Sequence, residues 1–240
     1  MRIIIVGRGN VATNLDYAFR CKGVECTMVS SREGLDTISQ NADVYIYAVR
    51  DEALAEVVAQ VSAPRALHLH TSGTMPLSVF GEDKPHAGIL YFFQSFSKSR
   101  LIDDFTTIPV FIEGRNIDDI SAIYTLAQTI TPRIYEANQH DRERLHIAGV
   151  FANNFANEMY AIAADMLRDT HIPFNALLPL IDQTAEKIHT LTPQQAQTGP
   201  ARRGDENVMQ HHLALLPNDE LRTLYRLVSK LIRQSAENAR

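Results

Sequence analysis

The sequence lacks the features that mark secreted, membrane-spanning or nucleic-acid-binding proteins. Its 240 residues include only two cysteines, Cys21 and Cys26, without the spacing of a metal site. No apolar run reaches the ~18 residues that span a bilayer, and the run at residues 3–6 is too short for a signal-peptide core. The net charge of −5 gives no general attraction to nucleic acid or anionic lipid. We expect a cytoplasmic protein that binds neither, with reduced thiols, although one disulfide is compatible with the sequence.

The first part of the chain alternates short apolar runs with helical patterns, which is typical of a parallel sheet with crossover helices. The expected strands are residues 2–6, 25–30, 44–49, 66–70, 87–93, 108–113 and 133–136. The expected helices between them are residues 11–22, 52–60 and 117–130. The strands are too continuously apolar for a sheet with one wet face, so we expect helices on both faces.

Beyond residue 138 the sequence shows no further strand. Residues 141–168 predict one long helix, apolar around most of its circumference and therefore central. A helix near residues 175–191 and a polar loop at 192–205 follow, and a last helix begins with Asn218 as its cap. We therefore predict an α/β domain over residues 1–138 and an all-helical domain over residues 139–240.

A glycine-rich segment follows the first strand directly and opens an amphipathic helix. It fits the pattern G-x-G-x-x-G/A, with Gly7, Arg8, Gly9, Asn10, Val11 and Ala12. Gly7 allows the tight turn, Gly9 allows the backbone to approach a pyrophosphate, and Ala12 allows the helix to pack close to the strand. In this context the pattern predicts a Rossmann-type dinucleotide site rather than a plain glycine turn.

The end of the second strand indicates which nucleotide is bound. NAD sites usually carry an acid there, whereas this chain has Ser30, Ser31 and Arg32, and Glu33 comes one residue late for a ribose ligand. Two hydroxyls and a guanidinium suit a 2′-phosphate. We predict NADP(H) as the cofactor, the alternative being that Arg32 is a solvated surface arginine.

Loops after the next two strands should line the same crevice. Val49 ends one strand, and Thr71, Ser72 and Gly73 follow the other, where the nicotinamide end of the nucleotide would lie. His70 precedes them and is either part of this site or a core histidine at a strand end.

Polar residues on the long helix suggest a reaction site. His146, Gly149, Asn153 and Asn157 follow helical spacing and share one face. Buried amides need partners, because an unpaired one costs about 1–3 kcal/mol. These amides either bind a substrate or satisfy loop backbone of the first domain. We take His146, Asn153 and Asn157 as candidate catalytic residues.

A second candidate lies in the polar loop. Arg202 and Arg203 could grip an acidic group of a substrate, the alternative being a solvated basic loop. Residues 204–205 also fit the turn and cap of the next helix. The adjacent histidines at 211–212 have no partner at metal-ligand spacing, and we predict no metal site.

The segments 7–12, 70–73, 93–97, 152–155 and 198–205 together resemble one family. It comprises bacterial Rossmann-like proteins with a helical C-terminal domain of unknown function, often labelled NADP oxidoreductases of the deazaflavin-dependent type. The layout is more distantly similar to pyrroline-5-carboxylate reductase, ketopantoate reductase and the 6-phosphogluconate dehydrogenase superfamily. The resemblance implies an oxidoreductase fold and a homodimer formed through the C-terminal helices.

The sequence departs from these relatives at the position of their proton donor. Several of them place a lysine one turn before an asparagine of the long helix, whereas this chain has Gly149 and Val150 there and no lysine between Lys98 and Lys187. His146 is the candidate substitute, since histidine, with an unperturbed pKa near 6.5, suits acid–base chemistry. Two functions follow: hydride transfer between NADP(H) and a small carbonyl, imine or deazaflavin, or a non-catalytic module that reports NADP(H) status to a protein partner.

Overall fold

The computed structural model describes residues 1–32 and 42–238, so Glu33 lies outside the described residues. The chain divides into two compact units, Met1–Met159 and Tyr160–Arg240. The strands end at Glu136, close to the predicted boundary at residue 138, but the first unit also includes the helical turns up to Met159. Assignment of separate roles to residues 1–138 and 139–240 stays a prediction.

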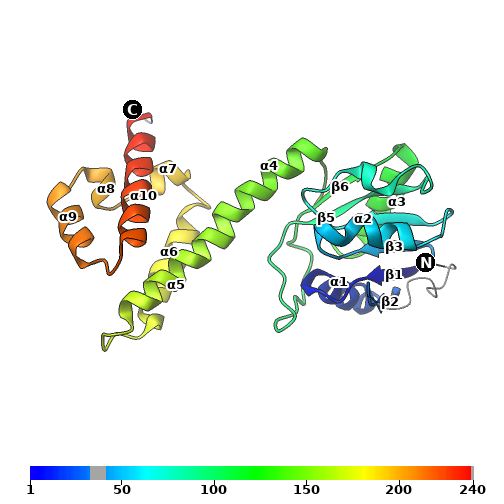
Figure 1. Ribbon diagram of the computed structural model, residues 1–240, viewed down its shortest axis with the longest axis horizontal. Helices are drawn as coiled ribbons and strands as arrows, with labels where there is room; N and C mark the ends of the chain where they lie inside the picture. Colours follow the sequence, from blue (N-terminus) through cyan, green and yellow to red (C-terminus); the bar gives the residue numbers. More distant parts are fainter. Residues whose placement is uncertain (33–41, 239–240) are drawn as a thin grey trace. The chain divides into compact units, whose positions relative to one another are not determined.

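The first unit is built on a seven-stranded sheet in the order β2-β1-β3-β4-β5-β6-β7. β2, β1, β3, β4 and β5 run parallel, β6 is antiparallel to β5, and β7 is parallel to β6. The strands are β1 (Arg2–Val6), β2 (Glu25–Val29), β3 (Val44–Tyr47), β4 (Leu67–His70), β5 (Ala87–Phe92), β6 (Val110–Gly114) and β7 (Ile134–Glu136). The predicted mostly parallel, Rossmann-type sheet is confirmed (Figure 1).

Helices cover both faces of the sheet, as the apolar strands predict. On β1, Ile3 and Ile5 pack on one side and Ile4 and Val6 on the other, because successive strand residues point to opposite faces. The first side is covered by α1 (Asn10–Cys21) and α3 (Ile117–Gln128). The second is covered by α2 (Asp51–Gln60) and the short helix η2 (Leu77–Phe80). Both cysteines are free, Cys21 exposed and Cys26 buried in the core.

The long helix predicted over residues 141–168 is interrupted. α4 (Gln139–Gly149) leads into a π-helical turn, η3 (Val150–Phe155), which continues as α5 (Ala156–Leu167). Asn138 caps α4 by accepting a hydrogen bond from the amide of Asp141. The expectation of a buried central helix is wrong for this chain, because α5 contains no buried residue. The rest of the described chain covers its apolar side chains only in part, as at Ile162 and Leu167.

The second unit is helical throughout its described residues, which confirms the all-helical C-terminal region. After η4 (Phe174–Leu177) come α6 (Leu178–Lys187), α7 (Pro193–Ala196), α8 (Pro200–Arg203), α9 (Glu206–Leu215) and α10 (Asp219–Asn238). The predicted loop at 192–205 instead holds two one-turn helices, each begun by a proline. Gly204, with φ of 71°, and the cap Asp205 start α9, and Asn218 caps α10 as predicted. Within residues 1–32 and 42–238, no helix is both long and apolar enough to cross a membrane.

Candidate nucleotide site and adjoining pocket

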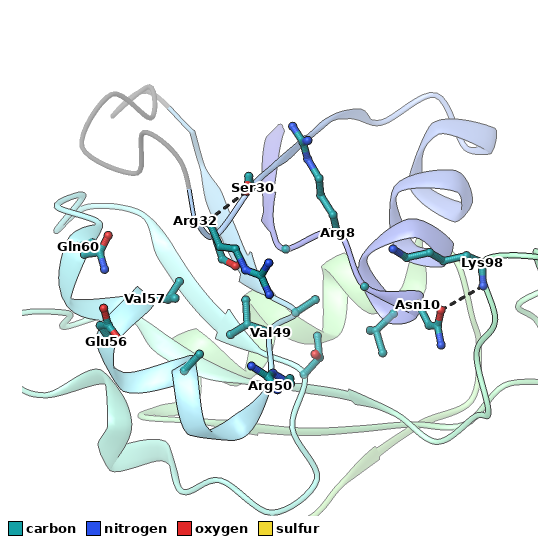
Figure 2. Close-up of a pocket in the computed structure, with 17 residues that line it drawn as sticks. Arg8, Asn10, Ser30, Arg32, Val49, Arg50, Glu56, Val57, Gln60 and Lys98 are labelled. Carbon is teal, nitrogen blue, oxygen red and sulfur yellow. Dashed lines mark hydrogen bonds between the residues drawn. The ribbon is translucent and has the colours of Figure 1, made fainter.

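A cavity of about 1260 Å³ opens at the carboxyl ends of the parallel strands (Figure 2). It contains predicted residues from all four segments expected at the crevice. Its lining residues are Gly7, Arg8, Gly9, Asn10, Val11, Ser30, Ser31, Arg32, Ala48, Val49, Arg50, Ala53, Glu56, Val57, Gln60, Thr71 and Lys98. The topology explains the position, since ligand crevices form where neighbouring strand ends lead to opposite faces of a sheet.

The glycine turn brings the backbone of two strands together. Gly7 has φ of 133°, and a Cβ atom there would lie 2.3 Å from the carbonyl oxygen of Ala48, so only glycine fits. Gly9 forms the cap of α1 without a side-chain hydrogen bond, and Ala12 is fully buried against the sheet. The first amides of α1 therefore face the cavity as hydrogen-bond donors with the positive end of the helix dipole behind them.

The cavity is rich in cationic groups. Arg32 follows β2, and its amide donates to Ser30 Oγ over 3.2 Å, while its side chain extends toward Val49 (Figure 2). Arg8, Arg50 and Lys98 add three more positive charges, against one lining carboxylate, Glu56. This balance suits an anionic ligand with more than one phosphate. Sequence reasoning assigned none of these three cations to the site, although Arg8 and Arg50 lie beside predicted residues.

Lys98 reaches the cavity because α1 holds its loop in place. Asn10 Oδ1 accepts from the amide of Lys98 at 3.2 Å. Asn14 is fully buried, donates to the carbonyl of Ser97 at 3.0 Å and accepts from the amide of Ile102 at 3.1 Å. No local motif reveals these contacts, which join residues more than 80 positions apart in the sequence.

Only one of the three predicted residues in the loop after β4 lies at the cavity. Thr71 lines the cavity, whereas Ser72 and Gly73 do not. Ser72 Oγ accepts from the amides of Thr74 and Met75 at 3.1 Å, and the Ser72 amide donates to His70 Nδ1 at 3.2 Å. His70 is thus a core histidine that organises the loop, and burial lowers its pKa to about 4. The binding roles of Ser72 and Gly73 stay predictions.

A second pocket of about 280 Å³ lies within the first unit. It brings the end of β5 together with α4 and the π-helical turn. Its lining residues are Tyr91, Phe93, Gln94, Ser95, His146, Gly149, Val150, Ala152, Asn153 and Asn154. Gln94 and Ser95 belong to the same loop as Lys98, so one segment contributes to both pockets.

Two of the three candidate catalytic residues line this second pocket. His146 and Asn153 do so, whereas Asn157 does not, and all three side chains are exposed. Asn153 lies in the π-helical turn, whereas Asn157 lies beyond it, in the first turn of α5. Among the described residues, neither Asn153 nor Asn157 makes a side-chain hydrogen bond, so the alternative that they satisfy loop backbone gains no support. The catalytic roles themselves stay predictions.

Glycine again permits a close approach at this pocket. A Cβ on Gly149 would lie 2.7 Å from Phe93 Cε2, so α4 packs directly on this ring. Tyr91, which sequence reasoning missed, lies beside it with its hydroxyl 3.1 Å from His146 Nδ1. Burial raises the pKa of Tyr91 to about 12. Tyr91 sits inside a strand without a motif, and only the tertiary contact marks it.

The candidate substrate-binding arginines belong to the other unit. Arg202 Nη1 donates to the carbonyl of Gln194, and Arg203 is exposed at the end of α8. Their role as substrate ligands stays a prediction. Within the described part of the chain, no group of three or more His, Cys, Asp or Glu side chains could hold a metal ion.

Comparison with known proteins places the chain in a family. Residues 108–232, just over half of the chain, match the family described as Domain of unknown function (DUF2520). A Bacteroides fragilis protein provisionally assigned as an NADP oxidoreductase is 37% identical, with a TM-score of 0.90, over 97% of this chain and 98% of its own. This chain belongs to the DUF2520 family. No curated protein matches this DUF2520 protein.

Solved structures with much lower identity share the fold of this DUF2520 protein. An imine reductase from Myxococcus stipitatus, in complex with NADP⁺, is 13% identical with a TM-score of 0.64, over 100% of this chain and 94% of its own. A reductive aminase from Aspergillus terreus, in complex with NADPH and ethyl levulinate, is 13% identical with a TM-score of 0.69, over 97% and 94%. At this identity the likeness shows the fold alone.

Proposed function

We propose that this protein is an NADP(H)-dependent oxidoreductase that acts on a small carbonyl or imine compound. One observation carries the proposal: the glycine turn closed against Ala48 opens into a large cavity that Arg8, Arg32, Arg50 and Lys98 surround with positive charge. The 37% identical relative assigned to NADP oxidoreductases supports it. A deazaflavin acceptor has no such support among the described residues.

Each part of the large cavity has a role in holding the nucleotide. The backbone at Gly9 and the first turn of α1 would receive the pyrophosphate, as helix N-termini do for anions. Ser30, Ser31 and Arg32 would hold the 2′-phosphate, where a bidentate guanidinium contact is strongest. Thr71 and Val49 would border the nicotinamide end. The nucleotide, when bound, supplies or accepts the hydride.

The second pocket is our proposed place for the reacting part of the substrate. His146 and Asn153 would orient the carbonyl oxygen or imine nitrogen, and Tyr91, Phe93 and Val150 would contact the apolar part of the substrate. Its volume of about 280 Å³ lies at the lower limit of roughly 300–1000 Å³ for ligand pockets, which favours a small substrate. We keep Arg202 and Arg203 as candidate ligands of an acidic substrate group.

We also propose a homodimer formed through the C-terminal helices. The second unit exposes many large apolar side chains, including Leu180 at 66% and Leu215 at 70% exposure. Contiguous exposed apolar surface marks an interaction site in most soluble proteins. A second copy of the chain is the partner that the family resemblance implies.

Calorimetric titration with NADPH and NADH tests the cofactor assignment. We expect Arg32→Ala to weaken NADPH binding by roughly 10- to 100-fold, because it removes a charged hydrogen bond worth about 1.5–3 kcal/mol, and to leave NADH binding nearly unchanged. Arg65→Ala removes an exposed arginine just before β4, at the opposite end of the strands, and serves as the control. Equal losses for both nucleotides would contradict a 2′-phosphate contact.

A panel of small ketones and imines with NADPH tests for turnover. Loss of turnover in His146→Ala and Asn153→Ala with intact NADPH binding would locate the reaction in the second pocket. Tight NADPH binding without turnover on any substrate would instead favour a nucleotide-sensing module, and an affinity for a protein partner that depends on NADPH would establish it.

A further inference from the structure

Tyr91 lies between Gly73, in the loop after β4, and the second pocket. A Cβ placed on Gly73 would be 2.7 Å from Tyr91 Cζ and 3.0 Å from its Oη, so the loop after β4 rests directly on the phenol. On its other side the phenol oxygen is 3.1 Å from His146 Nδ1, and the two ring centroids are 6.3 Å apart. All three residues belong to the Met1–Met159 unit, so this contact lies within one compact body.

The direction of the hydrogen bond between Tyr91 and His146 depends on which imidazole nitrogen bears the proton. Burial raises the pKa of Tyr91 to about 12, so the phenol keeps its proton at physiological pH. Within residues 1–32 and 42–238, His146 Nδ1 is the one hydrogen-bond partner of this hydroxyl. The protonated phenol can donate to a bare Nδ1 or accept from a protonated one, and in the first case the proton of the neutral imidazole lies on Nε2.

The same chain contains a second Tyr–His pair, in which both nitrogens of the imidazole have hydrogen-bond partners. Tyr47 Oη lies 2.9 Å from His68 Nδ1, and His68 Nε2 lies 2.9 Å from the carbonyl oxygen of Ala63. A carbonyl only accepts, so Nε2 of His68 must donate and Nδ1 must accept from the tyrosine. His146 has the tyrosine but, among the described residues, no carbonyl at Nε2, and it lines a pocket instead.

From this comparison, and resting on the oxidoreductase function proposed above, we propose that Tyr91 is the positioning residue of His146. Its hydroxyl holds the imidazole with the proton on Nε2, so that the second pocket offers an N–H donor to the carbonyl oxygen or imine nitrogen of the substrate. The substrate atom takes the place that the Ala63 carbonyl occupies at His68. Gly73 is small because any side chain there would displace the phenol from this position.

Nitrogen NMR of the full chain labelled with ¹⁵N-histidine tests the arrangement without a substrate. The spectra are recorded near pH 8.5, about two units above the ordinary histidine pKa, and His146→Gln identifies the resonances. We expect the wild-type protein to show His146 with a protonated Nε2 and an Nδ1 shifted by an accepted hydrogen bond. Tyr91→Phe, which removes only the hydroxyl, should abolish that shift and introduce the tautomer protonated on Nδ1.

Tyr135→Phe is the matched control. Tyr135 stacks on Phe111, which also contacts the Tyr91 ring, so this variant removes a hydroxyl from the same aromatic cluster without touching His146. It should leave the His146 resonances unchanged. Gly73→Ala should reproduce the change seen in Tyr91→Phe, because the added methyl displaces the phenol. Unchanged His146 resonances in Tyr91→Phe, or an equal change in Tyr135→Phe, would overturn the proposal.

Kinetics with a substrate from the panel separate positioning from binding. Tyr91→Phe should lower kcat roughly 10-fold or more with KM changed less than about threefold, since a misplaced catalytic group loses rate rather than ground-state affinity. A rise in KM alone would count against the positioning role. Failure of the wild-type protein to turn over any substrate would count against the oxidoreductase function, and the NMR result would stand by itself.

Discussion

The two units of the chain differ in how completely they bury their apolar side chains. In Met1–Met159 the sheet is covered on both faces, and the packing is tight enough that a Cβ on Gly88 would lie 2.2 Å from Ile123 Cδ1 of α3. In Tyr160–Arg240, α6 has no buried residue, although several of its side chains are large and apolar. The sheet of the first unit is covered within one chain, whereas α6 of the second unit is not.

This difference bears on where the chemistry resides. The residues that we propose to hold the nucleotide and to orient the substrate, from the glycine turn to Tyr91 and His146, belong to Met1–Met159. Functional groups are held best by side chains that packing has already fixed. The second unit instead presents a surface whose partner we propose to be a second copy. Variants that perturb one unit should therefore leave the other largely intact.

The largest expected effect is a loss of stability in the first unit, when a substitution leaves an empty space in its core. Leu69 in β4 is fully buried, and Leu69→Ala should lower the free energy of unfolding by about 2–5 kcal/mol. Urea unfolding followed by circular dichroism measures the loss. Ser78→Ala, at an exposed position of η2, provides the control and should stay within about 0.5 kcal/mol. A loss below about 1 kcal/mol for Leu69→Ala would show that the unit is not packed as described.

The next effect is a loss of stability in acid that should be confined to the same unit. Burial lowers the pKa of His70 to about 4, so the fold favours the neutral imidazole. This contribution is complete above pH 6.5, the unfolded value, and is lost as the pH falls from 6.5 toward 4. A shift of this size corresponds to on the order of 3 kcal/mol. His68, whose pKa burial also lowers, acts in the same direction.

Hydrogen exchange of β4 amides at pH 7.5 and pH 4.5 measures this loss within the sheet unit. His70→Asn should reduce the difference in β4 amide protection between pH 7.5 and pH 4.5. His189→Asn, which replaces an exposed histidine of the helical unit, should leave it unchanged. An undiminished pH dependence in His70→Asn would assign the acid sensitivity to other groups.

Sequence patterns predicted the sheet unit well because its signals are local. Apolar runs locate all seven strands, and the glycine turn at Gly7 and Gly9 follows from the nucleotide-binding pattern alone. In the second unit, the sequence also predicted the helix caps Asn218 and Asp205, because a cap accepts a hydrogen bond from a backbone amide only three residues away. Each of these predictions depends on residues close together in the chain.

What the sequence could not predict depends on distant residues. Lys98 reaches the large cavity through Asn10, and Tyr91 becomes significant only beside His146 and Gly73. The π-helical turn that contains Asn153 has no sequence pattern that distinguishes it from an ordinary helix. The apolar circumference of α5 predicted a buried helix, and this prediction is wrong within the single chain, because α5 contains no buried residue.

The smallest expected effect on folding comes from the exposed apolar face of the helical unit. Leu180 on α6 is 66% exposed. Leu180→Glu should therefore change the free energy of opening of β4, measured by amide hydrogen exchange, by no more than about 0.5 kcal/mol. If a second copy covers this face, the buried charge should dissociate the dimer, and sedimentation equilibrium should show the mass falling by half. Gln234→Glu places the same charge at an exposed polar position of α10 and should leave the mass unchanged. A wild-type protein that sediments as a monomer would remove the second copy as the partner, and the two units would then differ for another reason.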